Sequence, residues 1–483
     1  MSRQTQRVDD LLVSTNFVRA VRESGYLSLS TALAELVDNS LQAEATEVAV
    51  TILRSSPEAL PEIAVEDNGI GMTRGELEAC LRFGGTSRFD ARHSFGRFGM
   101  GLPAASLSQA KCVEVTSWRH HRAEYRVVLD VDAVVRGVGV TLIPHRVGSS
   151  RSESGCRVRW LQCDRIEYRR LAWLERALHR DLGRMYRRFL ASGLKLTING
   201  KKVEAVDPLL LDTKVEGSTA CLAFEPLQYE LESTAGESSV VTVRFAMLPV
   251  HRWHHLDKVT KRRVGIVGHP SVSILRAGRE IASGWHLMGG KRKENYDDWW
   301  RCEIEFEPAL DEHFGITINK QGIRPSAILR EAIEPELESV ARLLNARARQ
   351  AFEEVKVQAA AEASCRIASA ADPDLPIIAT RSGRGALTYR IASEPLPIES
   401  MFHSTLARRT LDLTLNADHP AFAALYQPLQ ALDGDAASHL RTALELFLLS
   451  FARSVAQMEQ SGQRFDDLLR VWSATYGRML QKS

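Results

Sequence analysis

The stretch ELVDNSLQA at residues 35–43 constrains the fold of this chain more than any other segment. Read as a helix with the residues before it, the stretch places apolar side chains on one side, namely Leu29, Leu33, Leu36, Val37 and Leu41. Glu35 and Asn39 lie one turn apart on the other side, together with Gln42. An amide oxygen suits Mg²⁺ and a nearby carboxylate can polarise water, which would suit a metal–nucleotide site. Taken alone, the pattern favours the solvated polar face of an ordinary amphipathic helix.

Two glycine-rich stretches change that interpretation. A strand-like segment at 63–66 runs directly into DNGIGM at 67–72, and GRFGMG at 96–101 precedes a helix-like segment at 102–110. Glycines at these spacings let backbone N–H groups approach phosphates without a Cβ in the way. The sequence DNG alone would predict an Asx turn. The three stretches in this order, within seventy residues, predict a nucleotide site, and the lack of GxxxxGK[ST] excludes a P-loop.

These stretches resemble the motifs of the GHKL ATPases, the superfamily of gyrase, heat-shock chaperones, histidine kinases and MutL. ELVDNSLQA resembles the first motif, DNGIGM the second and GRFGMG the third, and Thr116 on the strand-like CVEVTSW sits where the family has its fourth. The resemblance implies an α/β fold class: a Bergerat-type α/β sandwich that binds ATP and Mg²⁺. We expect this ATP-binding domain to occupy residues 1–200.

The resemblance also implies roles for individual residues. Glu35 would be the general base, Asn39 the magnesium ligand and Asp67 the acceptor of the adenine amino group, with Gly71 letting the base lie close. The mobile lid of the family would lie at 84–95, where Thr86, Ser87 and Arg88 either reach a phosphate or are plain loop residues. The remaining expected ATP-binding residues are Gly69, Met72, Gly96, Arg97, Phe98, Gly99, Met100, Gly101 and Thr116.

The rest of the chain predicts further domains. The basic stretch 165–192 has helical apolar spacing, so its charges predict a solvated face, and Asn199-Gly200 predicts a hairpin turn. Short strands over 201–330 predict a smaller α/β domain, which resembles the transducer domain of MutL-like and MORC-like members. Within it, ILRAGREI resembles a transducer strand, and Lys320 of ITINKQGIRPS would reach the γ-phosphate. Residues 331–483 predict a mainly helical region, with a linker near 366–398.

Bulk properties restrict the class of protein. A net charge of +2 leaves both nucleic acid and protein partners open, and the longest apolar runs are too short for a membrane span. Seven scattered cysteines without a CxxC pair favour reduced thiols and no zinc module. The polar N-terminus lacks the apolar region of a signal peptide, so we expect a cytoplasmic protein.

The sequence therefore predicts a MutL-like or MORC-like conformational ATPase that forms a homodimeric clamp when ATP binds. The alternative is a nucleotide-sensing scaffold or chaperone-like protein with negligible turnover. Two basic segments, 258–263 (KVTKRR) and 291–293 (KRK, near Tyr296, Trp299 and Trp300), either contact DNA or are solvated loops. A protein partner is equally compatible with the sequence.

Overall fold

The chain divides into two compact units, residues 1–345 and 346–483. Their boundary falls inside one long helix, α11 (Ala327–Ala371). The computed structural model describes residues 14–26, 28–56, 58–84, 100–136, 142–150, 153–166, 170–268, 271–316, 322–379, 385–397, 401–431, 435–461 and 475. Each unit has its own hydrophobic core, and the first unit has two.

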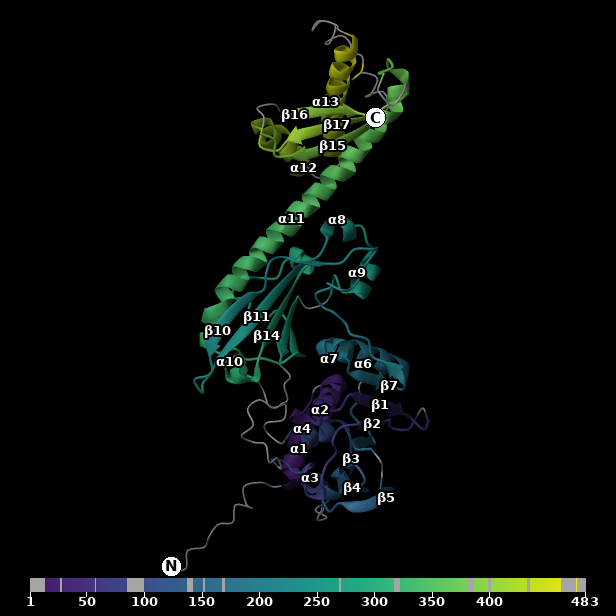
Figure 1. Ribbon diagram of the computed structural model, residues 1–483, viewed down its shortest axis with the longest axis vertical. Coiled ribbons are helices and arrows are strands. Elements are labelled where there is room, and N and C mark those ends of the chain that lie inside the picture. The colour runs from purple at the N-terminus through teal and green to yellow at the C-terminus, as the bar shows by residue number, and fades with distance from the viewer. Residues whose placement is uncertain are drawn as a thin grey trace, which may run out of the picture. The chain divides into compact units, whose positions relative to one another are not determined.

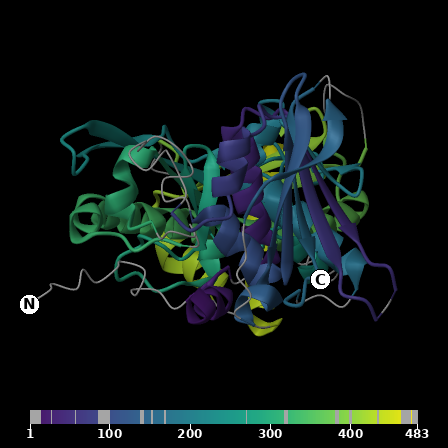
Figure 2. The ribbon, with the colours of Figure 1, turned by 90° about the horizontal axis from the view of Figure 1, so that it is seen from below.

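The first half of unit one is built on an eight-stranded mixed sheet with the order β5-β4-β3-β6-β2-β1-β7-β8. Its strands are β1 (Glu47–Leu53), β2 (Glu62–Asp67), β3 (Cys112–Trp118), β4 (Ala123–Asp130), β5 (His145–Ser150), β6 (Gly155–Leu161), β7 (Lys195–Ile198) and β8 (Lys201–Lys202). Its helices are α1 (Ser14–Ser24), α2 (Leu29–Gln42), α3 (Arg74–Ala79), α4 (Gly101–Gln109), α5 (Val131–Val135), α6 (Leu171–Met185) and α7 (Arg187–Ala191). Figure 2 shows helices packed on one face of this sheet. The α/β sandwich predicted from the sequence is confirmed.

Alternation along the strands explains why the helices cover one face. In β1, the side chains of Val48, Val50 and Ile52 are buried in the core while their neighbours are exposed or half-buried. On the other face, carboxylates and guanidinium groups pair across strands, as in Arg157–Glu66 (2.6 Å) and Arg159–Glu114 (2.9 Å). Solvent can therefore reach this second face without exposing apolar surface.

A second sheet completes unit one. It contains β9 (Cys221–Leu222), β10 (Leu227–Glu232), β11 (Ser238–Met247), β12 (Val272–Arg276), β13 (Arg279–Gly284) and β14 (Trp300–Phe306), with the order β10-β11-β14-β12-β13 and β9 beside β11. Short helices α8 (Val250–Trp253) and α9 (Lys258–Val264) lie between β11 and β12, and α10 (Asp311–Phe314) follows β14. The first part of α11 covers it, because Leu329, Ile333 and Leu337 are buried in the same core (Figure 1). This is the smaller α/β layer that the sequence predicted; its segment ILRAGREI forms a hairpin, β12–β13, instead of a single strand.

Unit two is mainly helical but also contains a small sheet that the sequence did not reveal. Strands β15 (Thr388–Glu394), β16 (Phe402–Ala407) and β17 (Thr410–Asn416) form the order β15-β17-β16, and helices α12 (Gln427–Ala431) and α13 (Asp435–Ser461) follow. The segment 366–398, expected to be a linker, holds the end of α11 and strand β15. Pro373 and Pro376 lie between these two elements, and Pro395 and Pro397 follow β15.

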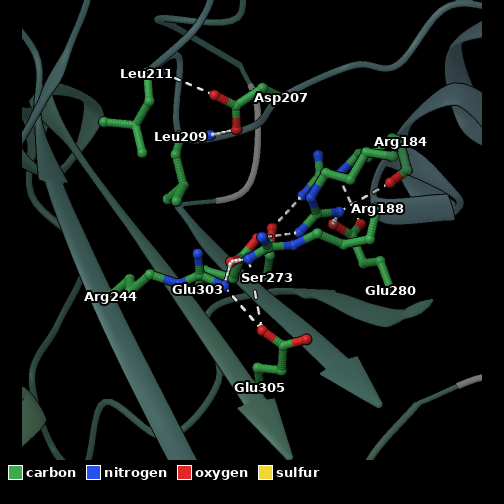
Figure 3. Close-up of polar contacts among 11 residues, drawn as sticks. Arg184, Arg188, Asp207, Leu209, Leu211, Arg244, Ser273, Glu280, Glu303 and Glu305 are labelled. Atoms are coloured by element: carbon green, nitrogen blue, oxygen red, sulfur yellow. Dashed lines mark hydrogen bonds and ion pairs between the residues drawn. The ribbon is translucent and has the colours of Figure 1, made fainter. Parts of the chain in front are cut away.

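Ion pairs join the two halves of unit one. Arg187 of α7 pairs with Glu280 (2.7 Å) and Glu303 (2.5 Å) of the second sheet, and all three side chains are buried. Arg184, Arg188, Arg244 and Glu305 extend this cluster (Figure 3). The basic stretch 165–192 was expected to present its charges to solvent. That expectation is wrong for Arg187, because its acidic partners come about a hundred residues later in the sequence.

Candidate active site

Helix α2 holds the first two predicted site residues. It begins after Ser28, whose Oγ accepts a hydrogen bond from the backbone N–H of Thr31 (3.2 Å). Asn39 is half-buried and Glu35 is only 4 % exposed. The expected apolar face is present, but Glu35 is as inaccessible as the leucines around it. A carboxylate kept this far from bulk water needs a specific environment, because burial disfavours its charge.

That environment includes the N-terminus of α4. A Cβ added at Gly101 would overlap the Glu35 carboxylate, so the acid lies directly against the first residue of α4. Met100, which precedes the helix, makes no side-chain capping bond. The first amides of a helix have no partners within it and carry a partial positive charge. A buried acid and a set of anion-binding amides therefore meet at one place.

Asp67 is the last residue of β2 and is hydrogen-bonded to helix α2. Its Oδ2 accepts a hydrogen bond from Ser40 Oγ (2.9 Å), and its Oδ1 accepts one from the backbone N–H of Gly69 (2.9 Å). Burial raises the pKa of the Asp67 carboxyl, while the bonds from Gly69 and Ser40 oppose the rise. Ser40 follows Asn39 directly, and no pattern in the sequence distinguishes it from an ordinary helical serine.

The backbone at residue 71 requires glycine whether or not an adenine base lies beside it. Its φ is +66°, and a Cβ there would overlap the backbone oxygen of Trp118. Gly69 is similarly restricted, because a Cβ would lie 2.6 Å from the carbonyl oxygen of Ala43. The backbone of residues 67–72 is therefore packed tightly between the end of α2 and the end of β3.

Strand β3 brings Ser117, and not Thr116, to this segment. Ser117 Oγ accepts a hydrogen bond from the N–H of Met72 (2.8 Å). Thr116 points to the opposite face of the sheet, where its Oγ accepts a bond from Arg126 Nε (3.2 Å). Successive residues of a strand face opposite ways, so an assignment shifted by one residue reaches the wrong face.

Cys156 of β6 is a further neighbour that the sequence did not identify. It pairs in register with Asp67 on one side and with Ser117 on the other. Burial, and then the charge of Asp67, raises the pKa of the Cys156 thiol well above its usual value. The thiol is thus a neutral, weakly polar group that lies beside Asp67.

Several predicted residues lie outside the described residues. These are Thr86, Ser87 and Arg88 of the expected lid, Gly96, Arg97, Phe98 and Gly99 of the third motif, and Lys320. The described part of the site consists of Glu35, Asn39, Asp67, the 69–72 turn and the start of α4. Among the described residues, no group of three His, Cys, Asp or Glu side chains is arranged to hold a metal ion. Asn39 places a half-buried amide on α2, one turn after Glu35.

Comparison with known proteins agrees with this geometry. A family model described as histidine kinase-, DNA gyrase B- and HSP90-like ATPase matches residues 27–144. No curated protein matches the chain. In the part of the chain that the structure describes, no helix is sufficiently long and apolar for a membrane span. Residues 27–144, which contain α2, the 67–72 turn and α4, belong to a GHKL-type ATPase domain.

Proposed function

We propose that this protein is a conformational ATPase that binds ATP with Mg²⁺, hydrolyses it, and closes as a homodimeric clamp on DNA. The observation that carries the proposal is the contact between the buried Glu35 carboxylate and Gly101 at the N-terminus of α4. This contact puts an acid next to amides suited to phosphate oxygens. Phosphoryl transfer relies on both kinds of group, a residue that positions or activates the nucleophile and donors that bind the phosphates.

Each residue then has a distinct role in hydrolysis. Glu35 takes the proton of the attacking water, Asn39 holds Mg²⁺, and Asp67 accepts the adenine amino group. Residues 96–101 and the first amides of α4 bind the phosphates. ATP supplies the phosphoanhydride bond that breaks, so the protein contributes chiefly position and electrostatic stabilisation. Lys320 would add a positive charge at the γ-phosphate.

Dimerisation would follow from the γ-phosphate. A ligand shifts a conformational equilibrium only by its different affinity for the two states. A contact between Lys320 and the γ-phosphate exists for ATP and not for ADP. Closure, and with it the clamp, would therefore require ATP.

The DNA part of the proposal is supported by α9. Lys258, Arg262 and Arg263 are exposed there, and within the described residues no carboxylate pairs with them. Arg262 and Arg263 line a cleft of about 1460 Å³, as does Lys214. Five acids line the same cleft as six arginine and lysine side chains; the acids are Asp181, Asp207, Glu216, Asp257 and Glu280. Asp207 accepts backbone bonds from Leu209 and Leu211 (Figure 3). Asp257 caps α9. The proposed contact with a phosphate backbone is therefore supported by the exposed arginines of α9, and not by a large net positive charge of the cleft.

The second basic segment gives no such support. Lys291 is buried and paired with Asp297 (2.8 Å), and Trp299 and Trp300 are buried as well. These aromatic side chains are not available to stack on bases. We therefore restrict the proposed DNA contact to α9 and its cleft.

The test is ATP binding and turnover in three variants. Asp67→Asn should abolish ATP binding, because the amide cannot accept the adenine amino group in the same way. Glu35→Gln should bind ATP and turn over about 10²-fold or more slowly, the usual scale for losing a general base. Asn39→Ala should lose the magnesium dependence of binding.

Glu114→Gln is the matched control, because Glu114 is a half-buried acid on the opposite face of the same sheet. It should leave both measurements unchanged. Wild-type affinity in Asp67→Asn, or normal turnover in Glu35→Gln, would overturn the assignment. Tight ATP binding with negligible turnover in the wild-type protein would instead identify a nucleotide-sensing scaffold.

A further inference from the structure

Asp38 is the most deeply buried acid of α2, with no exposed surface. Tyr186 Oη lies 2.7 Å from its Oδ1, and Arg279 Nε lies 3.0 Å from the same oxygen. Tyr186 belongs to the first half of unit one, whereas Arg279 begins β13 of the second sheet. The helix that carries Glu35 and Asn39 is therefore bonded to the second sheet through a buried ion pair.

The β12–β13 hairpin is shaped to deliver Arg279. Its turn residues, Ala277 and Gly278, both have positive φ (+47° and +80°), as a two-residue hairpin of the primed type requires. A Cβ at Gly278 would lie 3.6 Å from Arg188 Cβ, so the tip of the hairpin packs against α7. Arg279 follows this turn directly, and its side chain reaches Asp38 in the first half of unit one.

The residue after Arg279 is anchored in the same way. Glu280 pairs with Arg184 (2.6 Å) and with Arg187 (2.7 Å). Burial alone would lower the pKa of Arg187, but Glu280 and Glu303 raise it, so its charge is retained in the interface. The start of β13 is thus held by charge on two successive residues, one of which reaches α2.

Helical geometry gives this link a consequence for the site. Residues of an α-helix are spaced 100° apart, so Asp38 lies 60° from Glu35 and 100° from Asn39 around the axis. Holding Asp38 fixes the rotation of α2 and therefore the direction of both site residues. We propose that Asp38 is a positioning residue, and that Arg279 uses it to place the nucleotide site under the control of the second sheet. This inference rests on the function proposed above.

An ion pair suits this role better than an apolar contact. The ion pair sets the distance between Arg279 and Asp38, whereas apolar side chains pack in several arrangements. Replacing a buried pair by apolar residues is often neutral for stability, so stability does not explain its presence. Burial and then the charge of Glu35 raise the pKa of the Tyr26 hydroxyl, while Arg279 lowers it. Glu35, Arg279 and Tyr26 thus share one electrostatic environment.

The test is Arg279→Met, which keeps an unbranched side chain as far as the position of Nε and removes the charge. We expect faster hydrogen–deuterium exchange of the amides at 35–42 without nucleotide. We also expect turnover to fall about tenfold or more, because a displacement of about 1 Å can cost 10²-fold in rate. ATP should bind more weakly as well, because α2 carries Asn39 and orients Asp67 through Ser40.

Arg276→Met is the matched control. Arg276 is the cross-strand neighbour of Arg279 and is equally buried, but it pairs with Asp311 of its own domain (2.6 Å). It should cost stability without altering exchange at 35–42 or turnover per folded molecule. Equal effects of the two variants on exchange and turnover would overturn the proposal.

A double variant, Asp38→Leu/Arg279→Met, guards against misfolding of the single one. We expect it to recover the Tm of the wild-type protein and not its turnover. If the double variant recovered both the Tm and the turnover, the Asp38–Arg279 pair would only stabilise the fold, and the proposal would be overturned. If the wild-type protein does not bind ATP, the proposed function fails, and the exchange measurement still decides whether Arg279 holds α2.

Discussion

Ser40 donates a hydrogen bond of 2.9 Å to Asp67, so the helix that carries Glu35 and Asn39 also orients the acid at the end of β2. The proposed adenine and magnesium contacts are thus set by one helix. A shift of α2 would alter both ends of a bound nucleotide together. This relationship leads to the first prediction.

Ser40→Ala should move the pH dependence of ATP binding upward. Asp67 must be ionised to accept from adenine, and its pKa is raised by burial, so binding should weaken as pH falls through that raised value. Losing the Ser40 bond removes an interaction that lowers this pKa, so the weakening should begin at higher pH. Calorimetry across a pH series measures the effect, and an unchanged profile would contradict it.

The free energy of unfolding should change with pH in the opposite direction to that expected for an ion-paired acid. The folded protein binds the Asp67 proton more tightly than the unfolded chain does, so the contribution of Asp67 to the free energy of unfolding falls as pH rises. The fall occurs between the ordinary carboxyl pKa and the raised one.

Gly101→Ala should abolish most turnover, because its Cβ would displace the Glu35 carboxylate. In a Glu35→Ala background the same substitution should have little further effect. Gly75→Ala, in α3, is the control, since no described atom lies within 4 Å of the position of its Cβ. It should stabilise the fold by about 0.4–1 kcal/mol, as a compatible Gly→Ala change does. Additive losses in the double variant would show that Gly101 acts independently of Glu35.

Gly71→Ala should destabilise the fold more than Gly84→Ala. Both glycines have positive φ (+66° and +74°), which costs an L-residue about 1–2 kcal/mol. Only at Gly71 would the Cβ meet the backbone of Trp118, and such overpacking adds about 1–3 kcal/mol. Denaturant unfolding measures the difference, and equal losses would show that the Trp118 contact relaxes freely.

ATP should convert the protein from monomer to dimer, whereas ADP should not. Light scattering with a non-hydrolysable ATP analogue measures the change, and Lys320→Ala should remove it while ATP still binds. Lys202→Ala, on an exposed hairpin, should dimerise normally. A protein that stays monomeric with the analogue would disprove the clamp.

DNA affinity should fall steeply with salt and depend little on base sequence. Each phosphate contact adds about 0.9 to the slope of log affinity against log salt, so Arg262→Glu or Arg263→Glu should lower both affinity and slope. Arg82→Glu, at an exposed position on the first domain, should change neither. No binding at low salt would remove DNA from the proposed function.

The elements set by local pattern could be predicted from the sequence. Helix α2, strand β2 and the Asn199-Gly200 turn follow from apolar spacing and turn chemistry, and the structure has them at the expected places. The approach of Glu35 to Gly101 was suggested only by family resemblance, because 66 residues separate the two. Local spacing contains no information about which distant helix end an acid will meet.

Contacts specified by distant partners could not be predicted. Thr116 and Ser117 are adjacent in a strand whose residues are nearly all buried, so no periodicity indicates which one faces the site. Arg187 looks like a surface arginine until Glu280 and Glu303 are placed beside it. In unit two, β15 pairs in parallel with β17, and such pairing leaves no hairpin signal between the two strands.

The position of β6 in the sheet has a consequence for how the chain is made. β6 lies between β3 and β2, and β7 extends the sheet beyond β1, yet both strands come after residue 144, where the family match ends. A fragment ending there would lack β5 to β8, which leaves an unfilled slot between β3 and β2 and bare outer edges on β4 and β1. During synthesis, the ATP-binding half should therefore remain incompletely folded until about two hundred residues have left the ribosome. Until these strands are made, the unpaired strand edges of the nascent chain expose it to aggregation, so we expect chaperones to bind it during this period.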